Sequence, residues 1–548
     1  MNQMHLLRVA AVLLSLVFAL GVRAAGGPAL VVVLVIDGVP QEQLVKYRDL
    51  YGPGGFKRLL EDGAWFGNAH QAHAVTLTAP GHAAVLTGSY PYRNGIIANT
   101  WTDRNSLAQV YCTGDPAHSY IGEETKKLDG TSPANLRAST VGDELKYANN
   151  GQSKVIAISG KDRGAILLGG KRGIAYMYMD RSGRFASSTY YMKEHPEWHA
   201  RFYAAKPQDK WLGQAWSLLL PEPAYARSVA EGQPWQARNF AGMGGHFPFQ
   251  LPKGDALDAY HAALARTPFG DEATLEFARA AIEGESLGRN PAGVADILAI
   301  SLSTHDYVNH GFGPESRVSQ DHLLRVDRAL AGFFDTLDER IGLDKVLVVL
   351  TSDHGFMNAP EFSAAAGQGG ARLNAANMMA ELNGALAERF GVKGNLAARL
   401  SYPTIVLDQQ LIEKNFLNRG EVEAVAQRVL LALPGVAGVF TRSQLEFGAL
   451  PDLPLSKLVT RSWHRELSGD LYLVLQPHVL VGGNVATHGS PYRYDTNVPL
   501  MFLGKTWIKP GKYARAALVA DIAPTLSYLL KIRPPSASEG RVLEEILR

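Results

Sequence analysis

Six side chains of the types that bind divalent cations recur at a few points of this sequence. They are Asp37, Asp306, His310, Asp353, His354 and His488. Asp306 and His310 are four residues apart, which places both on one face of a helix if the segment is helical. Asp353 and His354 are adjacent and follow an apolar run, as Asp37 also does. Three carboxylates and three imidazoles suit two zinc-like ions with mixed nitrogen and oxygen ligands.

Each of these residues also has an ordinary structural explanation. A single Asp after a strand is more often a turn former or a helix cap, and His488 alone could be a surface histidine. His305, next to Asp306, is expected to point away from it. We interpret the other histidines considered as structural: His82, His195, His246 and His464. The set of six, and not any one member, favours a metal site.

Thr78 is the candidate nucleophile. It lies in Thr-Leu-Thr-Ala-Pro-Gly-His, residues 76–82, and one interpretation is that it caps a helix that begins near Pro80. The functional interpretation starts from the same place, because a helix N-terminus favours anions and a deprotonated threonine there can attack one. A metal lowers the pKa of bound water from about 15.7 to about 7, and it stabilises a bound threonine alkoxide in the same way. No adjacent general base is then required.

The elements that must position these residues follow an alternating pattern. Continuous, β-branched apolar runs predict buried parallel strands over 29–36, 154–159, 297–301, 346–351 and 498–503. Amphipathic stretches between them predict helices, most clearly over 321–343 and 521–530. Alternating strands and helices predict an α/β fold with a mostly parallel central sheet flanked by helices. In such sheets ligands bind beyond the carboxyl ends of the strands, where four of the runs deliver polar residues.

Two long stretches fit this alternation poorly, and we expect them to be cap insertions over the core. The predicted organisation is a signal peptide at 1–24, core at 25–170, a cap at 171–290, core at 291–363, a second insertion at 364–485 and core at 486–548. The aromatic residues of the first cap fit an entrance to the site and a cap core equally well. They are Tyr176, Tyr178, Tyr190, Tyr191 and Trp198.

Composition and charge exclude several classes of protein. The apolar share of 46% and the charged share of 19% are those of a globular chain. The net charge of +2 gives no basic excess that would indicate nucleic-acid binding. The short basic start, apolar stretch and small residues before Ala25 predict a cleaved secretory signal and hence export, with an uncleaved anchor as the alternative. The one cysteine, Cys112, is expected to be a buried apolar residue.

The motifs as a set are recognisable. The chain contains VLVIDG, TLTAPGH, YPYRNGIIANTW, SGKDRG, STHDYVNHGFGP, TSDHGF and THGSPYRYDTNVPLMF. In these it resembles the alkaline phosphatase superfamily, and more narrowly the PafA-type periplasmic alkaline phosphatases, which are related to the type I phosphodiesterases and nucleotide pyrophosphatases. The resemblance covers nearly all of the chain after the signal. It implies an alkaline-phosphatase-like fold and zinc-dependent hydrolysis of phosphate monoesters in the periplasm.

The resemblance also implies roles for individual residues. One of two Zn²⁺ ions would be held by Asp306, His310 and His488. The other would be held by Asp37, Asp353, His354 and Thr78. Thr78 would form a covalent phosphothreonine. Asn99 would donate a hydrogen bond to a phosphoryl oxygen, and Lys161 and Arg163 would contact the remaining ones.

Lys161 and Arg163 separate the subclasses within this resemblance. A monoester is a dianion and carries more charge than a diester, and a lysine and an arginine supply a point charge and a bidentate fork. The similar diesterases lack the pair, so its presence favours small phosphate monoesters. The alternative function is that of a phosphodiesterase or nucleotide pyrophosphatase on the same metal core. The alternative explanation of Lys161 and Arg163 is that they lie in a solvated loop without a role in binding. We expect a monomer without a stable membrane anchor or nucleic-acid partner.

Overall fold

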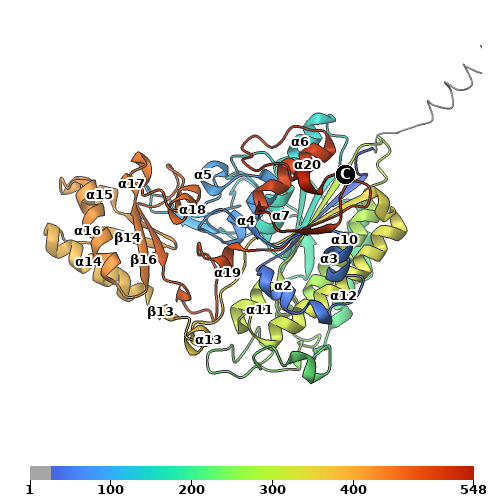
Figure 1. Ribbon diagram of the computed structural model, residues 1–548, viewed down its shortest axis with the longest axis horizontal. Coiled ribbons are helices and arrows are strands. Elements are labelled where there is room, and N and C mark those ends of the chain that lie inside the picture. Colours follow the sequence, from blue (N-terminus) through green and yellow to red (C-terminus); the bar gives the residue numbers. More distant parts are fainter. Residues whose placement is uncertain (1–25) are drawn as a thin grey trace, which may run out of the picture.

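The computed structural model describes residues 26–548, and the signal peptide expected over 1–24 lies outside them. In this part of the chain the main sheet has nine strands in the order β20-β2-β19-β12-β1-β11-β6-β7-β8. Its strands are β1 (Leu30–Ile36), β2 (Ala64–Phe66), β6 (Val155–Ser159), β7 (Ile174–Met179), β8 (Arg184–Ala186), β11 (Asp296–Leu302), β12 (Val346–Thr351), β19 (Leu500–Leu503) and β20 (Gly511–Tyr513). Helices cover both of its faces (Figure 1).

The centre of the sheet is parallel, as predicted. β1 pairs in parallel with β11 and with β12, and β11 pairs in parallel with β6. The run over 498–503 is the exception, because β19 pairs with β12 in the antiparallel direction. The prediction of a parallel strand there was wrong. An apolar run shows that a strand is buried but carries no information about its direction.

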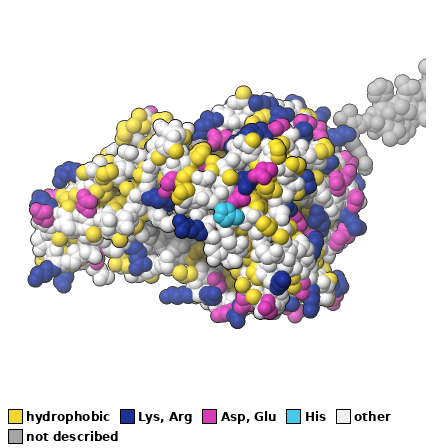
Figure 2. Space-filling model, turned by 90° about the horizontal axis from the view of Figure 1, so that it is seen from below, with side chains coloured by type: hydrophobic (Ala, Val, Ile, Leu, Met, Phe, Trp, Pro, Cys, Tyr) yellow, Lys and Arg dark blue, Asp and Glu magenta, His cyan; other side chains and the backbone are white. Residues whose placement is uncertain are grey.

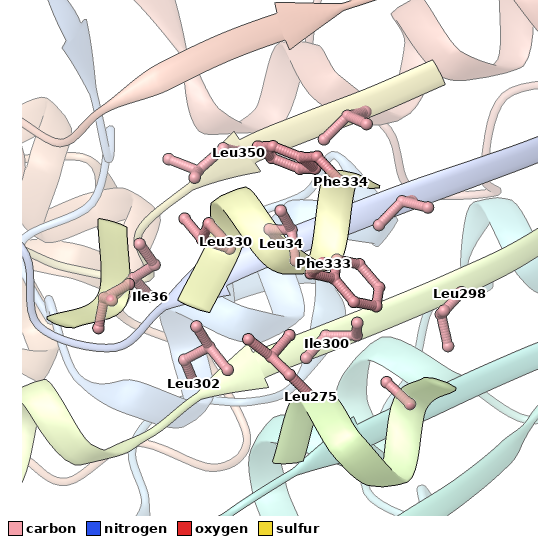
Figure 3. Close-up of a cluster of buried hydrophobic side chains, with 14 of the residues drawn as sticks. Leu34, Ile36, Leu275, Leu298, Ile300, Leu302, Leu330, Phe333, Phe334 and Leu350 are labelled. Carbon is pink, nitrogen blue, oxygen red and sulfur yellow. The ribbon is translucent and has the colours of Figure 1, made fainter. Parts of the chain in front are cut away.

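Alternate residues of β1 supply the two halves of the core. Leu34 and Ile36 pack on the face covered by α10 (Pro268–Glu285) and α12 (Arg317–Arg340), as Figure 3 shows for Leu275, Leu330, Phe333 and Phe334. Val33 and Val35 face the other side, which is covered by α4 (Thr78–Thr87), α6 (Val141–Ala148) and α20 (Ile522–Leu530). A strand buried on both faces has to be apolar at every position, which accounts for the unbroken run of β1. The predicted helices at 321–343 and 521–530 correspond to α12 and α20.

The two predicted insertions differ in how far they leave the main sheet. β7 and β8, at the start of the first, are strands of the sheet itself, and α10, at its end, packs on the sheet. The second insertion, residues 364–485, is here called the inserted lobe, and it contains a separate four-stranded sheet. Its strands are β14 (Ala397–Ser401), β15 (Thr404–Leu407), β17 (Leu471–Leu475) and β16 (Val436–Thr441), with α14 (Ala375–Phe390) and α16 (Arg419–Ala432) against them. Figure 1 shows the lobe at the left.

The face shown in Figure 2 has no large patch of side chains of a single type. Apolar, basic and acidic side chains are interspersed over that face. Within residues 26–548 we find no helix whose length and apolar character would let it cross a membrane. Cys112 is fully buried, and burial raises the pKa of its thiol to about 12, which agrees with the expected apolar role.

Candidate active site

The six predicted metal ligands converge at the carboxyl edge of the parallel strands. Asp37 follows β1, and Asp353 and His354 follow β12. Asp306 and His310 lie one turn apart on α11 (Thr304–Phe312), directly after β11. The remaining member, His488, precedes β19, whose antiparallel direction brings its start to this same edge.

The distances between ligand atoms are those of one continuous cluster. His310 Nε2 and His488 Nε2 lie 3.4 and 3.3 Å from Asp306 Oδ1. His354 Nε2 lies 3.4 Å from Asp37 Oδ1 and 3.3 Å from Asp353 Oδ2. The ligand atoms of Asp306, His310 and His488 are all within 4.8 Å of one another, and so are those of Asp37, Asp306 and His354. The second set shares Asp306 with the first, so the two groups are adjacent.

Several of these atoms have no hydrogen-bond partner among residues 26–548. Asp37 Oδ1, Asp306 Oδ1, Asp353 Oδ2 and His354 Nε2 are buried and accept or donate no hydrogen bond in the described part of the chain. A buried carboxylate oxygen without a partner costs more free energy than a typical hydrogen bond returns. A cation placed among these atoms would remove that cost. The residues present therefore fit one or two divalent ions.

Backbone carbonyls fix the orientation of the three imidazoles. Nδ1 of His310 lies 2.9 Å from the carbonyl oxygen of Ala486, and Nδ1 of His488 lies 2.8 Å from that of Thr76. Nδ1 of His354 lies 2.9 Å from the carbonyl oxygen of Gly355. Because Nδ1–H donates to a carbonyl in each case, the lone pair is on Nε2, which points into the cluster. This is the tautomer that a metal-binding histidine needs.

Burial and like charges shift the protonation of the cluster. Burial, together with the neighbouring carboxylate of Asp353, raises the pKa of Asp37 well above its ordinary value. Burial lowers the pKa of His310 to about 4 and that of His354 to about 3, although Asp306 and Asp353 oppose the change. Both imidazoles are therefore neutral near pH 7, as metal ligands must be.

Thr78 is the first residue of α4, with Leu77 in the N-cap position, so the interpretation of Thr78 as the cap of a later helix was wrong. It is 1% exposed. Gly81, one turn on, lets α4 approach the strand edge, since a Cβ there would clash with the carbonyl of Asp353. Asn99 is anchored beside Thr78, because its Oδ1 accepts a 2.8 Å hydrogen bond from the Ala79 amide. The Nδ2 group of Asn99 has no partner within residues 26–548 and can donate to a ligand.

Lys161 reaches the centre of the cluster from the N-cap of α7 (Asp162–Gly169). Its Nζ lies 2.7 Å from Asp37 Oδ2 and 2.6 Å from Asp306 Oδ2. Burial alone would lower the pKa of Lys161, but the carboxylates of Asp306 and Asp37 outweigh burial and raise it above the ordinary value. The ammonium is therefore charged, and it pairs with the Oδ2 atoms of the two carboxylates whose Oδ1 atoms stay unpartnered.

Arg163, two residues after Lys161 in the first turn of α7, is held by a residue that the sequence did not single out. Its Nη1 donates to the Tyr111 hydroxyl at 3.3 Å, and that hydroxyl donates to Asp162 Oδ1 at 2.6 Å. Tyr111 lies on β5 (Gln109–Tyr111), a short hairpin strand that follows Asn99. Nothing in the local pattern around Tyr111 distinguishes it from other half-buried tyrosines.

His82 belongs to the surroundings of the cluster. Its Nδ1 lies 2.9 Å from the Thr78 carbonyl oxygen and 3.2 Å from Asp353 Oδ2, and its Nε2 lies 2.8 Å from Ser301 Oγ. Asp37, His82 and Asp353 also form a group with ligand atoms within 4.8 Å. Since Nδ1–H donates to the Thr78 carbonyl and Nε2 contacts the Ser301 hydroxyl, we interpret His82 as a residue that orients Thr78. His305 points away from Asp306, toward His322 and Gln43.

The aromatic residues proposed for an entrance belong largely to the interior. Tyr176 and Tyr178 lie on β7 and are 0% and 9% exposed, and Trp198 is 7% exposed on α8 (Glu197–Ala204). All three are part of the core cluster around Phe277. Tyr178 also borders a cavity of about 290 Å³ that opens beside Lys161 and Arg163.

Comparisons with known proteins agree over nearly the whole chain. The model of the family described as type I phosphodiesterase / nucleotide pyrophosphatase matches residues 31–488. The alkaline phosphatase PhoV of Synechococcus elongatus is 37% identical, over 95% of this chain and 93% of that protein. The alkaline phosphatase PafA of Elizabethkingia meningoseptica is 34% identical, over 96% of this chain and 95% of that protein. A protein of Myroides odoratus named calcium-transporting ATPase is 37% identical, over 95% of both chains.

Solved structures of alkaline phosphatase PafA share the fold. The wild-type crystal structure superposes with a TM-score of 0.88 and 33% identity, over 96% of this chain and all of that one. A crystal structure of a variant superposes with a TM-score of 0.89 and 32% identity over the same shares. In that variant one threonine is changed to serine, and one asparagine, one lysine and one arginine are changed to alanine.

Proposed function

The chain belongs to the type I phosphodiesterase / nucleotide pyrophosphatase family, and from that premise we propose that it is an alkaline phosphatase that hydrolyses phosphate monoesters. The observation that carries the proposal is the contact of Lys161 with Asp37 and Asp306 in the cluster beside Thr78, with Arg163 two residues further on in the first turn of α7. The four residue types changed in the PafA variant occur here in the same order and at the same intervals, as Thr78, Asn99, Lys161 and Arg163.

The charge of the site favours a monoester over a diester. A terminal phosphoryl group is a dianion, whereas a diester carries one charge. The Lys161 ammonium within the cluster and the Arg163 guanidinium two residues further on add two positive charges to a site whose carboxylates would be neutralised by cations. Without such cations the three carboxylates would repel either substrate.

We assign two zinc-like divalent cations to the cluster. Asp306, His310 and His488 would hold one, and Asp37, Asp353, His354 and the Thr78 hydroxyl the other. When bound, such a pair supplies activation of the hydroxyl group and stabilisation of the attacking and leaving oxygens of an in-line displacement. The donor set of imidazole nitrogens and carboxylate oxygens suits zinc.

The protein's own residues then carry the reaction. Thr78 Oγ1 forms a bond to phosphorus and the bond to the ester oxygen breaks, so that the leaving alcohol takes up a proton and phosphothreonine remains. In the second step water attacks phosphorus and the bond between phosphorus and Thr78 Oγ1 breaks, so that inorganic phosphate leaves and the hydroxyl is restored. Asn99 Nδ2, Lys161 Nζ and the Arg163 guanidinium orient the three other phosphoryl oxygens through both steps, and His82 fixes the backbone of Thr78.

The experiment that tests the proposal compares three substrates with a defined metal content. We expect kcat/KM for an aryl phosphate monoester to exceed that for a bis-aryl phosphodiester by orders of magnitude. ATP is included because a related protein is named an ATPase and the terminal phosphoryl group of ATP has the charge of a monoester. A preference for the diester would instead assign the chain to the phosphodiesterases. No hydrolysis of any substrate by the zinc-loaded protein would refute an enzymatic role.

We also propose that the protein is exported to the periplasm and acts there as a monomer on small phosphate esters. The support is the basic start, apolar stretch and small residues of positions 1–24. N-terminal sequencing of the exported protein should give a chain that begins at Ala25. A chain that retains Met1 and stays with the membrane fraction would contradict the cleavage.

A further inference from the structure

We propose that Tyr307 is a positioning residue that holds the Lys161 ammonium at the phosphoryl site through its aromatic ring, and that it thereby sets the preference for monoesters. The inference rests on the proposed function. Tyr307 follows Asp306 directly on α11, so one helical turn presents both a carboxylate and an aromatic face to Lys161. Neither the motifs nor the assigned roles give Tyr307 a function.

The geometry around the ring is that of a cation–π contact. Lys161 Nζ lies 4.8 Å from the centroid of the Tyr307 ring. The Arg266 guanidinium carbon lies 4.8 Å from the same centroid. An ammonium within about 6 Å of a ring face is attracted by its negative potential, and most strongly where water is excluded. Lys161 meets the second condition, because it is only 4% exposed.

The ring differs from the other partners of Lys161 in an important way. Within residues 26–548 the Lys161 ammonium contacts Asp37, Asp306 and the Tyr307 ring. Both carboxylates are also the proposed ligands of the divalent cations, so their negative charge would be shared. Tyr307 is the contact that carries no other assigned role. It therefore supports Lys161 whatever the carboxylates bind.

The space beside Lys161 explains why a support is needed. A cavity of about 290 Å³ adjoins Lys161, Arg163 and Tyr307 and is open to solvent. A lysine side chain has four rotatable bonds and can turn its strongly hydrated ammonium toward water. Tyr307 lines this cavity together with Lys161, and its ring lies 4.8 Å from the ammonium. Loss of the ring would leave the ammonium held only by the carboxylates of Asp37 and Asp306, whose charge the cations would share.

The test replaces Tyr307 by leucine and by phenylalanine. We expect Tyr307→Leu to lower kcat/KM for an aryl monoester on the order of tenfold and that for a diester much less. Tyr307→Phe keeps the ring and should restore most of the lost activity. Isothermal calorimetry with inorganic phosphate gives a second readout, and Tyr307→Leu should weaken binding by a similar factor. Equal losses for both substrate classes, or equal effects of Leu and Phe, would overturn the inference.

A double-mutant comparison separates positioning from a general structural effect. In the Lys161→Ala background, a further change of Tyr307 to leucine should have little additional effect on monoester turnover, because the ring then has no ammonium to hold. If the two losses multiply instead, Tyr307 acts independently of Lys161 and the inference fails. If the unmodified enzyme prefers diesters, the proposed function fails, while the phosphate-binding measurement still tests the contact.

Fluorinated phenylalanines at position 307 keep the test valid if Tyr307→Leu does not fold. Each added fluorine weakens the negative potential of the ring with little change in shape. Monoester kcat/KM should fall stepwise from phenylalanine to trifluorophenylalanine in the otherwise unchanged enzyme. A flat series would exclude a cation–π contact.

Discussion

The active-site edge of the main sheet and the base of the inserted lobe each bury a set of ionised side chains, and the two sets differ in how completely the protein satisfies them. At the active site four buried ligand atoms have no partner in the described residues. In the lobe, Asp470 is 0% exposed and Arg442 is 1% exposed. Both regions have given up the hydration of charged groups, which costs several kcal/mol per ion in a protein interior.

In the lobe, partners from the protein offset that cost. Asp470 Oδ1 accepts a hydrogen bond from Arg442 at 3.1 Å and another from Arg104 at 2.6 Å. Asp470 Oδ2 accepts a hydrogen bond from the Leu407 amide at 2.8 Å. Arg442 donates further to the Ser468 carbonyl and to Glu446. Arg104 belongs to the hairpin that follows Asn99, so this network also ties the lobe to the segment beside the candidate site.

The difference separates a structural network from a functional one. A structural network gains by satisfying every group, because each unpartnered buried charge lowers the free energy of unfolding. The active site keeps unpartnered groups close together in a geometry that a cation and a phosphoryl group can complete. We therefore expect changes in the two regions to affect different measurements.

The largest expected effect is that of Thr78→Ala. Removal of the hydroxyl should lower kcat for an aryl monoester by at least about 10³-fold, because the covalent step is lost. The melting temperature and circular dichroism should stay close to those of the unmodified protein, since the Thr78 hydroxyl has no hydrogen-bond partner in residues 26–548. Normal turnover by this variant would show that Thr78 is not the nucleophile.

Removal of metal tests the unpartnered atoms directly. Chelation should abolish activity and lower the melting temperature, because a ligand present at 1,000 times its Kd stabilises the folded state by about 4 kcal/mol. Zinc should restore both. Thr78→Ala is the matched control, since its melting temperature should fall on chelation although it has no activity to lose. Full activity in the chelated protein would show that the unpartnered atoms do not hold a metal that the reaction needs.

The lobe should respond in stability and not in turnover. Arg442→Met leaves Asp470 with one guanidinium fewer, and breaking such a buried pair costs about 3 to 5 kcal/mol. Urea denaturation should show this loss, whereas kcat below the unfolding transition should stay within a few-fold of normal. Arg428→Met, an exposed change on α16, is the control and should change stability by less than about 0.5 kcal/mol. A loss of kcat in Arg442→Met without a loss of stability would show that the lobe network contributes to catalysis.

Glu315 lies between the two cases, because it is only 4% exposed and belongs neither to the lobe network nor to the active-site cluster. Burial raises its pKa to about 7, against weak hydrogen bonds from the Ala359 amide. Between pH 4.5 and about 7 the folded protein thus holds a proton that the unfolded chain has lost, so stability falls as pH rises through this window.

Glu315→Gln should remove this dependence, which amounts to up to about 3 kcal/mol. The measurement is the free energy of unfolding of both proteins at pH 5 and pH 8. Parallel pH profiles for the two proteins would mean that Glu315 ionises normally.

Residue types and their placement after apolar runs were sufficient to predict that most of the candidate ligands lie close together. Asp37, Asp353 and His354 follow strands buried on both faces, and such strands end at one edge of a parallel sheet. Asp306 and His310 share a helical face by their spacing alone. The doubly buried strands likewise specify the α/β class, because only a sheet covered by helices on both sides can use them.

Other features depend on tertiary contacts that no local pattern encodes. His488 reaches the cluster because β19 runs antiparallel to β12, and its sequence neighbours do not indicate that direction. Tyr176 and Tyr178 extend the main sheet as part of β7, although their aromatic surroundings suggested a cap. The Tyr111 hydroxyl contacts Arg163 and the Tyr307 ring contacts Lys161 only after folding.

The sequence by itself determined which chemical groups are present. They are a threonine hydroxyl, an asparagine amide, a lysine and an arginine side chain, and six candidate metal ligands. Most of them follow strands that are apolar enough to be buried. The tertiary structure decided which of these meet and which atoms stay unpartnered, such as Asp353 Oδ2 and His354 Nε2. The physical reason is that apolar periodicity reports burial along one element. The satisfaction of a buried polar atom depends instead on groups that arrive from distant parts of the chain.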